Sequence, residues 1–201
     1  MTLRLGVRRI PTLYRYGSVS SINTINRRTL FTFNLNEQKE KLGSIQTYKL
    51  VRTIDAKPKQ IYEVVSQIDK YTDFIPYCID SFIDKRDLIT GNPISAGLRI
   101  GFQSYDEKFV CNVNCQEFQE KQKFIVEAES TSHNLFKTCS TKWTIIPNPR
   151  KPNISQVELT LRFQFHSLLY NSVSSIFANN LTNLAMAAFQ RRSVELNKKE
   201  F

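Results

Sequence analysis

Histidine is scarce in this chain, and paired cysteines are missing. The 201 residues include two histidines, His133 and His166, which lie far apart, and no Cys-x-x-Cys motif. Cys111 and Cys115 in an extended strand would stand roughly 13 Å apart, beyond the reach of a disulfide. The sequence therefore predicts free, buried thiols and disfavours a zinc site or a Ser-His-Asp triad.

Long apolar runs are missing as well. No stretch of about eighteen apolar residues occurs, so we expect no transmembrane helix. Any association with a membrane is then expected to be peripheral. We find no internal repeat and no linker that would split the body of the chain.

Acidic residues are absent from residues 1–36, whereas six arginines and many hydroxyl residues are present there. Leu3, Leu5, Val7 and Ile10 add an apolar face between the arginines. This composition is typical of a mitochondrial transit peptide, and a disordered basic tail is the alternative. We expect a mitochondrial transit peptide and leader over residues 1–36 and one folded domain over residues 37–201.

The formal net charge of +10 falls to +4 when those six arginines are set aside. The remaining body is only mildly basic and shows no basic stripe with interleaved aromatic residues. A nucleic acid is therefore not the expected partner, although a ribosome- or RNA-associated module stays open as an alternative function.

Two hydrophobic periods divide the body of the chain. Apolar residues alternate with polar ones in several segments, most cleanly over 157–166, and this period of two predicts strands with one covered face. From 172 to 196 the apolar residues recur at helical spacing without Pro or Gly, which predicts one long helix. The strands are expected at 45–54, 78–89, 98–102, 109–115, 124–128, 135–146 and 157–166, with helical turns over 58–74 and a proline-rich loop at 147–152.

An antiparallel sheet with one apolar face needs a cover, and the long C-terminal helix is the element available. We therefore expect an α+β helix-grip fold, in which a curved antiparallel sheet wraps around that helix.

The segment 61–78 carries the most specific motif of the chain. It resembles the opening signature of the mitochondrial coenzyme Q-binding proteins and their bacterial relatives, a family of START-like domains. The matching residues are Tyr62, Val64, Val65, Tyr71, Phe74, Pro76, Tyr77 and Cys78. The strand around Trp143 and the closing helix are also similar, so the resemblance extends from about residue 45 to the C-terminus.

This resemblance implies a non-enzymatic protein that binds coenzyme Q (ubiquinone) in an apolar cavity. It implies a lipid chaperone or carrier needed for respiratory electron transport and efficient ubiquinone biosynthesis. It also places the protein at the matrix face of the mitochondrial inner membrane, with anionic lipid, late quinone precursors and quinone-biosynthetic or respiratory complexes as expected partners. Ubiquinone is then a bound ligand, and no catalytic cofactor is expected.

Helix-grip domains hold their cavity between sheet and helix, so the resemblance favours a cavity over a solid core formed by the same residues. The candidate wall residues are Phe102, Trp143, Leu161, Phe163, Phe165, Phe177, Leu181 and Leu184. Tyr71, Phe74, Pro76 and Tyr77 are candidates for the entrance, and a structural turn is the equally weighted alternative.

Four cations crowd the end of the last helix: Arg191, Arg192, Lys198 and Lys199. They suit the negative end of the helix dipole, and they are also candidates for contact with anionic lipid.

A cyclase-type enzyme remains an alternative, because some helix-grip proteins are cyclases. It would need an acid or base facing the cavity, whereas His166 falls on the polar side of its strand and His133 in an expected loop. We therefore predict binding without catalysis.

Overall fold

The computed structural model describes residues 45–102, 105–132, 136–166 and 168–199, although the side chains at 102, 105, 168–179, 181 and 199 lie outside this description. The predicted transit peptide over 1–36, the start of the predicted domain at 37 and His133 also lie outside the described residues. The elements are β1 (Gln46–Ile54), α2 (Pro58–Ser66), η1 (Ile68–Asp73), β2 (Cys78–Arg86), β3 (Pro93–Phe102), β4 (Tyr105–Phe118), η2 (Gln119–Lys121), β5 (Lys123–Ser130), β6 (Phe136–Asn148), β7 (Lys151–Phe165) and α3 (Leu168–Lys199).

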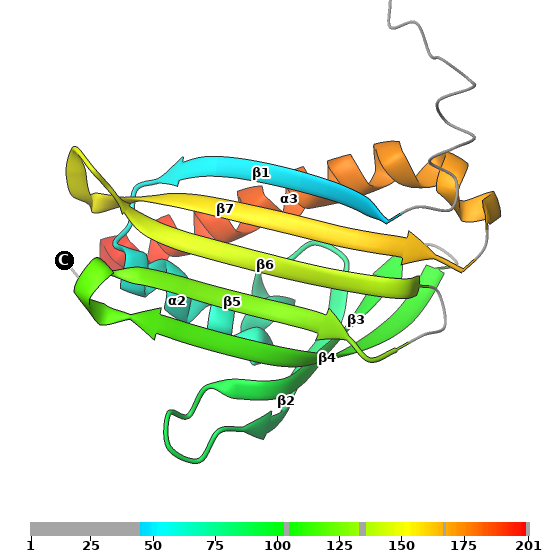
Figure 1. The fold of residues 1–201 in the computed structure, drawn as a ribbon, viewed down its shortest axis with the longest axis horizontal. Helices are drawn as coiled ribbons and strands as arrows, with labels where there is room; N and C mark the ends of the chain where they lie inside the picture. The colour runs from blue at the N-terminus through cyan, green and yellow to red at the C-terminus, as the bar shows by residue number, and fades with distance from the viewer. Residues whose placement is uncertain (1–44, 103–104, 133–135, 167, 200–201) are drawn as a thin grey trace, which may run out of the picture. The chain divides into compact units, whose positions relative to one another are not determined.

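One antiparallel sheet contains seven strands in the order β1-β7-β6-β5-β4-β3-β2. Strands β2 to β7 pair with their neighbours in the chain, and β1 returns to pair with β7, from Gln46 opposite Phe163 to Ile54 opposite Ser155. Figure 1 shows the curvature of this sheet and α3 running behind it. The predicted helix-grip architecture, with its curved antiparallel sheet and long C-terminal helix, is confirmed.

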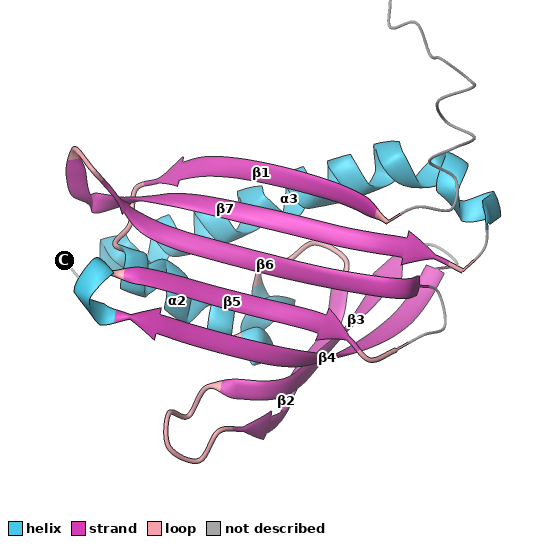
Figure 2. Ribbon diagram, viewed as in Figure 1, coloured by secondary structure: helices cyan, strands magenta, loops and turns pink. Residues whose placement is uncertain are grey.

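The helices lie together on one face of the sheet. Helix α2 contacts β5, β6 and β7, helix α3 contacts β1 and β7, and the two helices contact each other. Figure 2 shows them as a layer behind the strands. Among the helices in the described part of the chain, none is both long and apolar enough to span a bilayer.

Helix α2 begins at Pro58, a residue suited to a first helical turn because it needs no partner for a backbone N–H. The Gln60 side chain accepts a hydrogen bond from the Lys57 N–H at 3.1 Å and thereby caps the helix. Ile61 and Val65, one turn apart, are fully buried against the sheet. The amphipathic spacing thus fixes which face of α2 meets the core.

Strand β7 shows how alternation sets the covered face. Val157, Leu159 and Phe163 are buried, whereas Arg162 on the other parity is exposed. The covered face points toward the helices and the other face toward solvent, as the alternation predicts.

The loop predicted over 147–152 is shorter in the structure, where a turn at Pro149 and Arg150 joins two strands. Strand β6 continues to Asn148 and β7 begins at Lys151, so Pro147 and Pro152 lie within strands. A register shift between Pro147 and Asn148 explains why the two strands accommodate these prolines, because proline fits a sheet where the ladder is irregular.

The strand expected over 78–89 ends earlier, at Arg86. The Asp87 carboxylate accepts hydrogen bonds from the N–H groups of Ile89 and Thr90 at 3.0 and 2.7 Å, and Gly91 adopts a φ of +72°. These contacts form a tight turn that stops the strand, because the Asp87 side chain satisfies the backbone in place of a ladder partner.

Candidate functional site

An apolar cavity of about 340 Å³ lies on the covered face of the sheet. Its wall is built from β3 to β7, from η1 and the residues after it, and from the middle of α3. Its volume falls in the lower part of the range of roughly 300–1,000 Å³ for small-molecule sites. Among the described residues that line it, none carries a charged side chain.

Four neighbouring strands form the deepest part of the wall through residues of one parity. Val113, Val126, Trp143 and Leu159 are buried and line the cavity, and they come from β4, β5, β6 and β7 in turn. The register places Val126 opposite Trp143 and Trp143 opposite Leu159. Alternation along each strand therefore brings distant segments of the sequence to one surface.

An aromatic cluster closes one end of the cavity. The Phe189 ring on α3 lies 4.6 Å from Trp143, 5.1 Å from Tyr71 and 5.1 Å from Phe74, measured between ring centroids. The Tyr71 hydroxyl donates a hydrogen bond to the Val65 carbonyl at 2.5 Å. Burial raises the pKa of Tyr71 well above its usual range, so this wall stays neutral.

The mouth of the cavity lies between the segment that follows η1 and the middle of α3. Tyr77 and Leu184 line the cavity and yet remain 44% and 39% exposed. Tyr77 has a φ of +65°, a strained conformation for a residue with a side chain, and its carbonyl accepts the Gly101 N–H at 2.9 Å. Such strain is concentrated at functional positions in proteins, which makes Tyr77 a notable rim residue.

Several polar side chains of the wall lie on three adjacent strands. Cys111 on β4 pairs with Ser130 on β5, while Cys139 and Thr141 follow on β6. Burial raises the pKa of Cys111 to about 11 and that of Cys139 to about 12, so both are neutral thiols near pH 7. None of these four residues is among the wall residues predicted from the sequence, although Cys111 shares its parity with Phe109 and Val113 along one strand.

Several predicted site residues do meet at this cavity. Trp143, Leu161 and Leu184, expected in the wall, line it together with Tyr71, Pro76 and Tyr77, expected at the entrance. Tyr71 is buried rather than at the rim, because its ring packs against Phe189.

Other predicted site residues lie apart from the cavity. Phe74 packs behind its wall, and Phe163 and Phe165 lie further along β7, where both rings contact Phe136 at 5.9 and 4.6 Å. The parity of Phe163 gives it the covered face, but its position along the strand takes it past the cavity. The side chains of Phe102, Phe177 and Leu181 lie outside the described residues.

The cations predicted for membrane contact differ in their surroundings. Arg191 and Lys198 are exposed, whereas the Arg192 guanidinium lies 3.9 Å from the Asp73 carboxylate and over the Phe74 ring at 5.8 Å. The side chain of Lys199 lies outside the described residues.

Few residues near the cavity could act as a general acid, a general base or a metal ligand. His166 is exposed at the end of β7, and Asp69 lies 3.6 Å from Arg86. Within the described ranges, no cluster of three or more His, Cys, Asp or Glu side chains could hold a metal ion.

Comparisons with known proteins agree with this geometry. The family described as polyketide cyclase / dehydrase and lipid transport matches residues 54–190. Coenzyme Q-binding protein COQ10, mitochondrial, of Saccharomyces cerevisiae is 50% identical over 151 residues, covering 75% of this chain and 72% of that protein. The protein of the same name from Eremothecium gossypii is 46% identical over 175 residues, covering 87% and 83%.

Solved structures share the fold at much lower identity. A START superfamily protein from Mycobacterium smegmatis superposes with a TM-score of 0.63 at 15% identity, covering 75% of this chain and 98% of that one. The Zhui aromatase/cyclase from Streptomyces sp. R1128 gives a TM-score of 0.56 at 12% identity, covering 75% and 94%. With the fold, the cavity and these relatives in place, the chain belongs to the polyketide cyclase / dehydrase and lipid transport family, in the branch that holds the coenzyme Q-binding proteins.

Proposed function

We propose that the chain binds coenzyme Q in the cavity and acts as a lipid carrier or chaperone rather than an enzyme. The observation that supports this most strongly is the wall itself, which is mostly apolar and carries no charged side chain among its described residues. Burying an unpaired charge in such a wall is costly, so the wall selects a neutral ligand. Coenzyme Q is neutral, and two relatives at 46–50% identity are named for binding it.

The physical chemistry of the ligand defines what the protein must supply. Each isoprene unit of the tail contributes on the order of 3 kcal/mol against water, at about 0.8 kcal/mol per buried methylene. A bilayer is as apolar as the cavity wall, so transfer of the tail from membrane to protein gains little. Selectivity therefore comes from the quinone head, and loading takes place at a membrane surface.

Binding without catalysis is supported by the chemistry of the wall. A general acid or base must reach the reacting atom, and Cys111, Cys139 and Tyr71 in the wall have raised pKa values. The other titratable group among the described wall residues is the Tyr77 phenol at the rim. The cyclase neighbour shares the fold at 12% identity, and a shared fold does not transfer its chemistry.

The location proposed is the mitochondrion, at the matrix face of the inner membrane, in support of respiratory electron transport and ubiquinone synthesis. The relatives named mitochondrial and the acid-free, arginine-rich residues 1–36 support this proposal.

Trp143 provides a direct test of binding, because it is the single tryptophan of the chain and it lines the cavity. Titration with a short-tailed ubiquinone is expected to quench Trp143 fluorescence with saturation at one quinone per chain. An aliphatic alcohol of equal length is the control and should leave the emission nearly unchanged. Quenching that rises linearly without saturation would contradict a site beside Trp143.

Membrane docking through the end of α3 makes a second prediction. Changing Arg191 and Lys198 to Gln should weaken binding to phosphatidylcholine vesicles that contain cardiolipin by about fivefold per cation, because each cation near an anionic surface contributes about 1 kcal/mol. Vesicle flotation across a salt series measures this loss.

The matched control removes two cations from the solvent face of the sheet, Lys49 and Lys142, which pair with Glu158 and Glu127 at 2.9 and 2.7 Å. This variant has the same net charge and should float like the unchanged protein. Equal losses in both variants would show that net charge alone, and not the end of α3, determines docking.

A further inference from the structure

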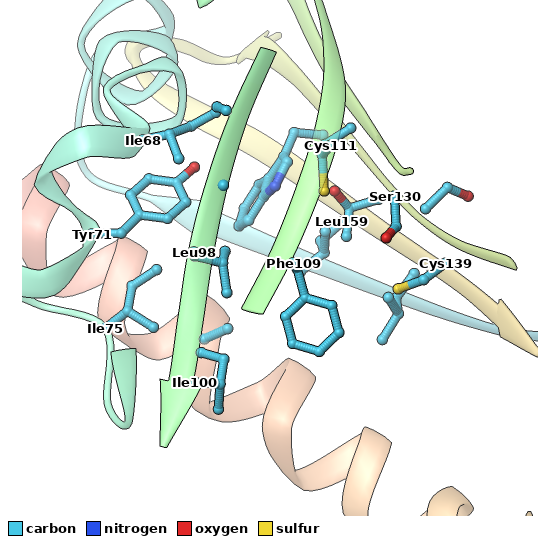
Figure 3. A pocket seen from close by; sticks show the side chains of 18 of the residues that line it. Ile68, Tyr71, Ile75, Leu98, Ile100, Phe109, Cys111, Ser130, Cys139 and Leu159 are labelled. Atoms are coloured by element: carbon cyan, nitrogen blue, oxygen red, sulfur yellow. The ribbon is translucent and has the colours of Figure 1, made fainter. Parts of the chain in front are cut away.

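Two thiols and a hydroxyl lie on three adjacent strands of the cavity wall, at a place which we call the thiol row: Cys111 on β4, Ser130 on β5 and Cys139 on β6. Cys111 and Ser130 are direct cross-strand partners, and β6 is the next strand of the sheet. Figure 3 shows the two sulfur atoms and the Ser130 hydroxyl turned toward the interior of the pocket. The rest of the wall is mainly aliphatic and aromatic, with further hydroxyl side chains at Ser140, Thr141 and Thr182, and the row holds its two thiols.

The four cysteines of the chain fall into two groups by their partners. Outside the cavity wall, the Cys78 thiol donates a hydrogen bond to the Asp80 carbonyl at 3.3 Å, and Cys115 is hydrogen-bonded with Tyr62. Inside it, Cys111 and Cys139 have no hydrogen-bond partner anywhere in the part of the chain that the structure describes. Both thiols are half-buried and turned into the cavity, so their S–H groups are free to donate to an acceptor on a bound ligand.

The Ser130 hydroxyl differs from the two thiols, because it already has hydrogen-bond partners within the chain. Its hydroxyl donates to the Ser132 carbonyl and accepts the Ser132 N–H, both at 3.2 Å. Ser130 therefore fixes the end of β5 beside the thiols, and the free donors of the row are the two S–H groups.

The thiols remain donors at physiological pH. Burial raises the pKa of both well above 9, so neither exists as a thiolate near pH 7. This also keeps them weak nucleophiles beside an electrophilic ring, because the thiolate is the reactive form of cysteine.

An oxidised quinone head complements such a row. Its carbonyl and methoxy oxygens only accept hydrogen bonds, and thiols are weak donors that offer them partners without charge. The reduced head instead carries two O–H groups that need acceptors, and sulfur is a poor acceptor. Burial of those O–H groups beside the thiol row leaves them poorly satisfied, which lowers affinity.

We propose that Cys111 and Cys139 hold the carbonyl oxygens of the quinone head and make the cavity prefer the oxidised quinone over its hydroquinone. This inference rests on the proposed function and deepens it, since it assigns the head-group contact and its redox preference.

The experiment measures the affinity of the full chain for a short-tailed ubiquinone and for the same compound kept reduced under anaerobic conditions. The unchanged protein should bind the oxidised form about fivefold more tightly. In the double variant Cys111→Ala/Cys139→Ala, the ratio of the two affinities should fall close to one, because the oxidised form binds more weakly. The control Cys78→Ala/Cys115→Ala removes two thiols outside the wall, one buried and one half-buried, and should keep the ratio.

A conservative variant covers the case in which the alanine variant does not fold. Cys111→Ser/Cys139→Ser keeps a donor at both positions, so it should bind the oxidised form about as tightly as the unchanged protein, whereas its hydroxyl oxygens also accept hydrogen bonds and should strengthen binding of the reduced form. Equal affinity of the unchanged protein for both forms, an unchanged ratio in the folded alanine variant, or weaker binding of the oxidised form by the folded serine variant would overturn the inference. Failure of the unchanged protein to bind either form would instead overturn the proposed function on which the inference rests.

Discussion

Replacing Ala185 by phenylalanine is expected to abolish quinone binding while leaving the melting temperature of the lipid-free protein nearly unchanged. Ala185 lies on α3 and lines the cavity, so a benzyl group at this position would occupy space that the ligand needs. An open cavity absorbs the added volume, whereas overpacking a solid core costs about 1–3 kcal/mol. The measurement pairs quinone-dependent quenching of Trp143 with thermal unfolding of the lipid-free protein.

Ala187 provides the matched control on the same helix. It is exposed, two residues away, and does not line the cavity. Ala187→Phe should bind quinone like the unchanged protein and melt at a similar temperature. A fall in melting temperature confined to Ala185→Phe would indicate a solid core, and full quinone binding by that variant would show that the ligand does not lie against α3.

Removing the Phe189 ring should have the largest effect on stability. This buried ring joins α3 to Tyr71, Phe74 and Trp143 at centroid distances of 4.6 to 5.1 Å. Phe189→Ala should lower the free energy of unfolding by about 3–5 kcal/mol, because the lost burial and the resulting void both act against the folded state. At about 2–4 °C per kcal/mol for a domain of this size, the melting temperature should fall by roughly 10 °C.

Phe118 is the control for the loss of a phenyl ring, since it is 44% exposed at the end of β4. Phe118→Ala should change stability by no more than about 0.5 kcal/mol. Similar melting temperatures for the two alanine variants would show that the aromatic cluster around Phe189 does not hold the helix to the sheet.

The order and type of the elements were predictable because the hydrophobic period changes where the structure changes. The period of two over β7 and the helical spacing in α3 are visible without any tertiary contact. The resemblance at 61–78 then supplied the expectation of a cavity, which periodicity by itself does not distinguish from a solid core.

The position along each strand at which side chains meet the cavity was not predictable in the same way. Parity assigned Leu161 and Phe163 to one face of β7, yet Leu161 lines the cavity and Phe163 lies beyond it, stacked 5.7 Å from Tyr48. Which residue of a strand meets the cavity depends on the register with β1 and β6 and on where α3 crosses the sheet, and these are tertiary properties.

The thiol row was missed for a related reason. Each cysteine read alone is a small buried hydrophobe, and only the pairing of β4 with β5 and β6 brings Cys111 and Cys139 to one polar spot. Proline disfavours ladders, which predicts a loop at Pro147 and Pro152, whereas a bulge over residues 152–154 of β7 accommodates both prolines within the strands.

Organic extraction of the purified protein, followed by mass analysis of the released lipid, tests the central claim most directly. Because the described wall of the cavity is mostly apolar and carries no charged side chain, the extract should contain coenzyme Q in an amount approaching one molecule per chain, and Ala185→Phe prepared in parallel should release little. An extract that holds fatty acids or phospholipids at that stoichiometry and no quinone would contradict the claim.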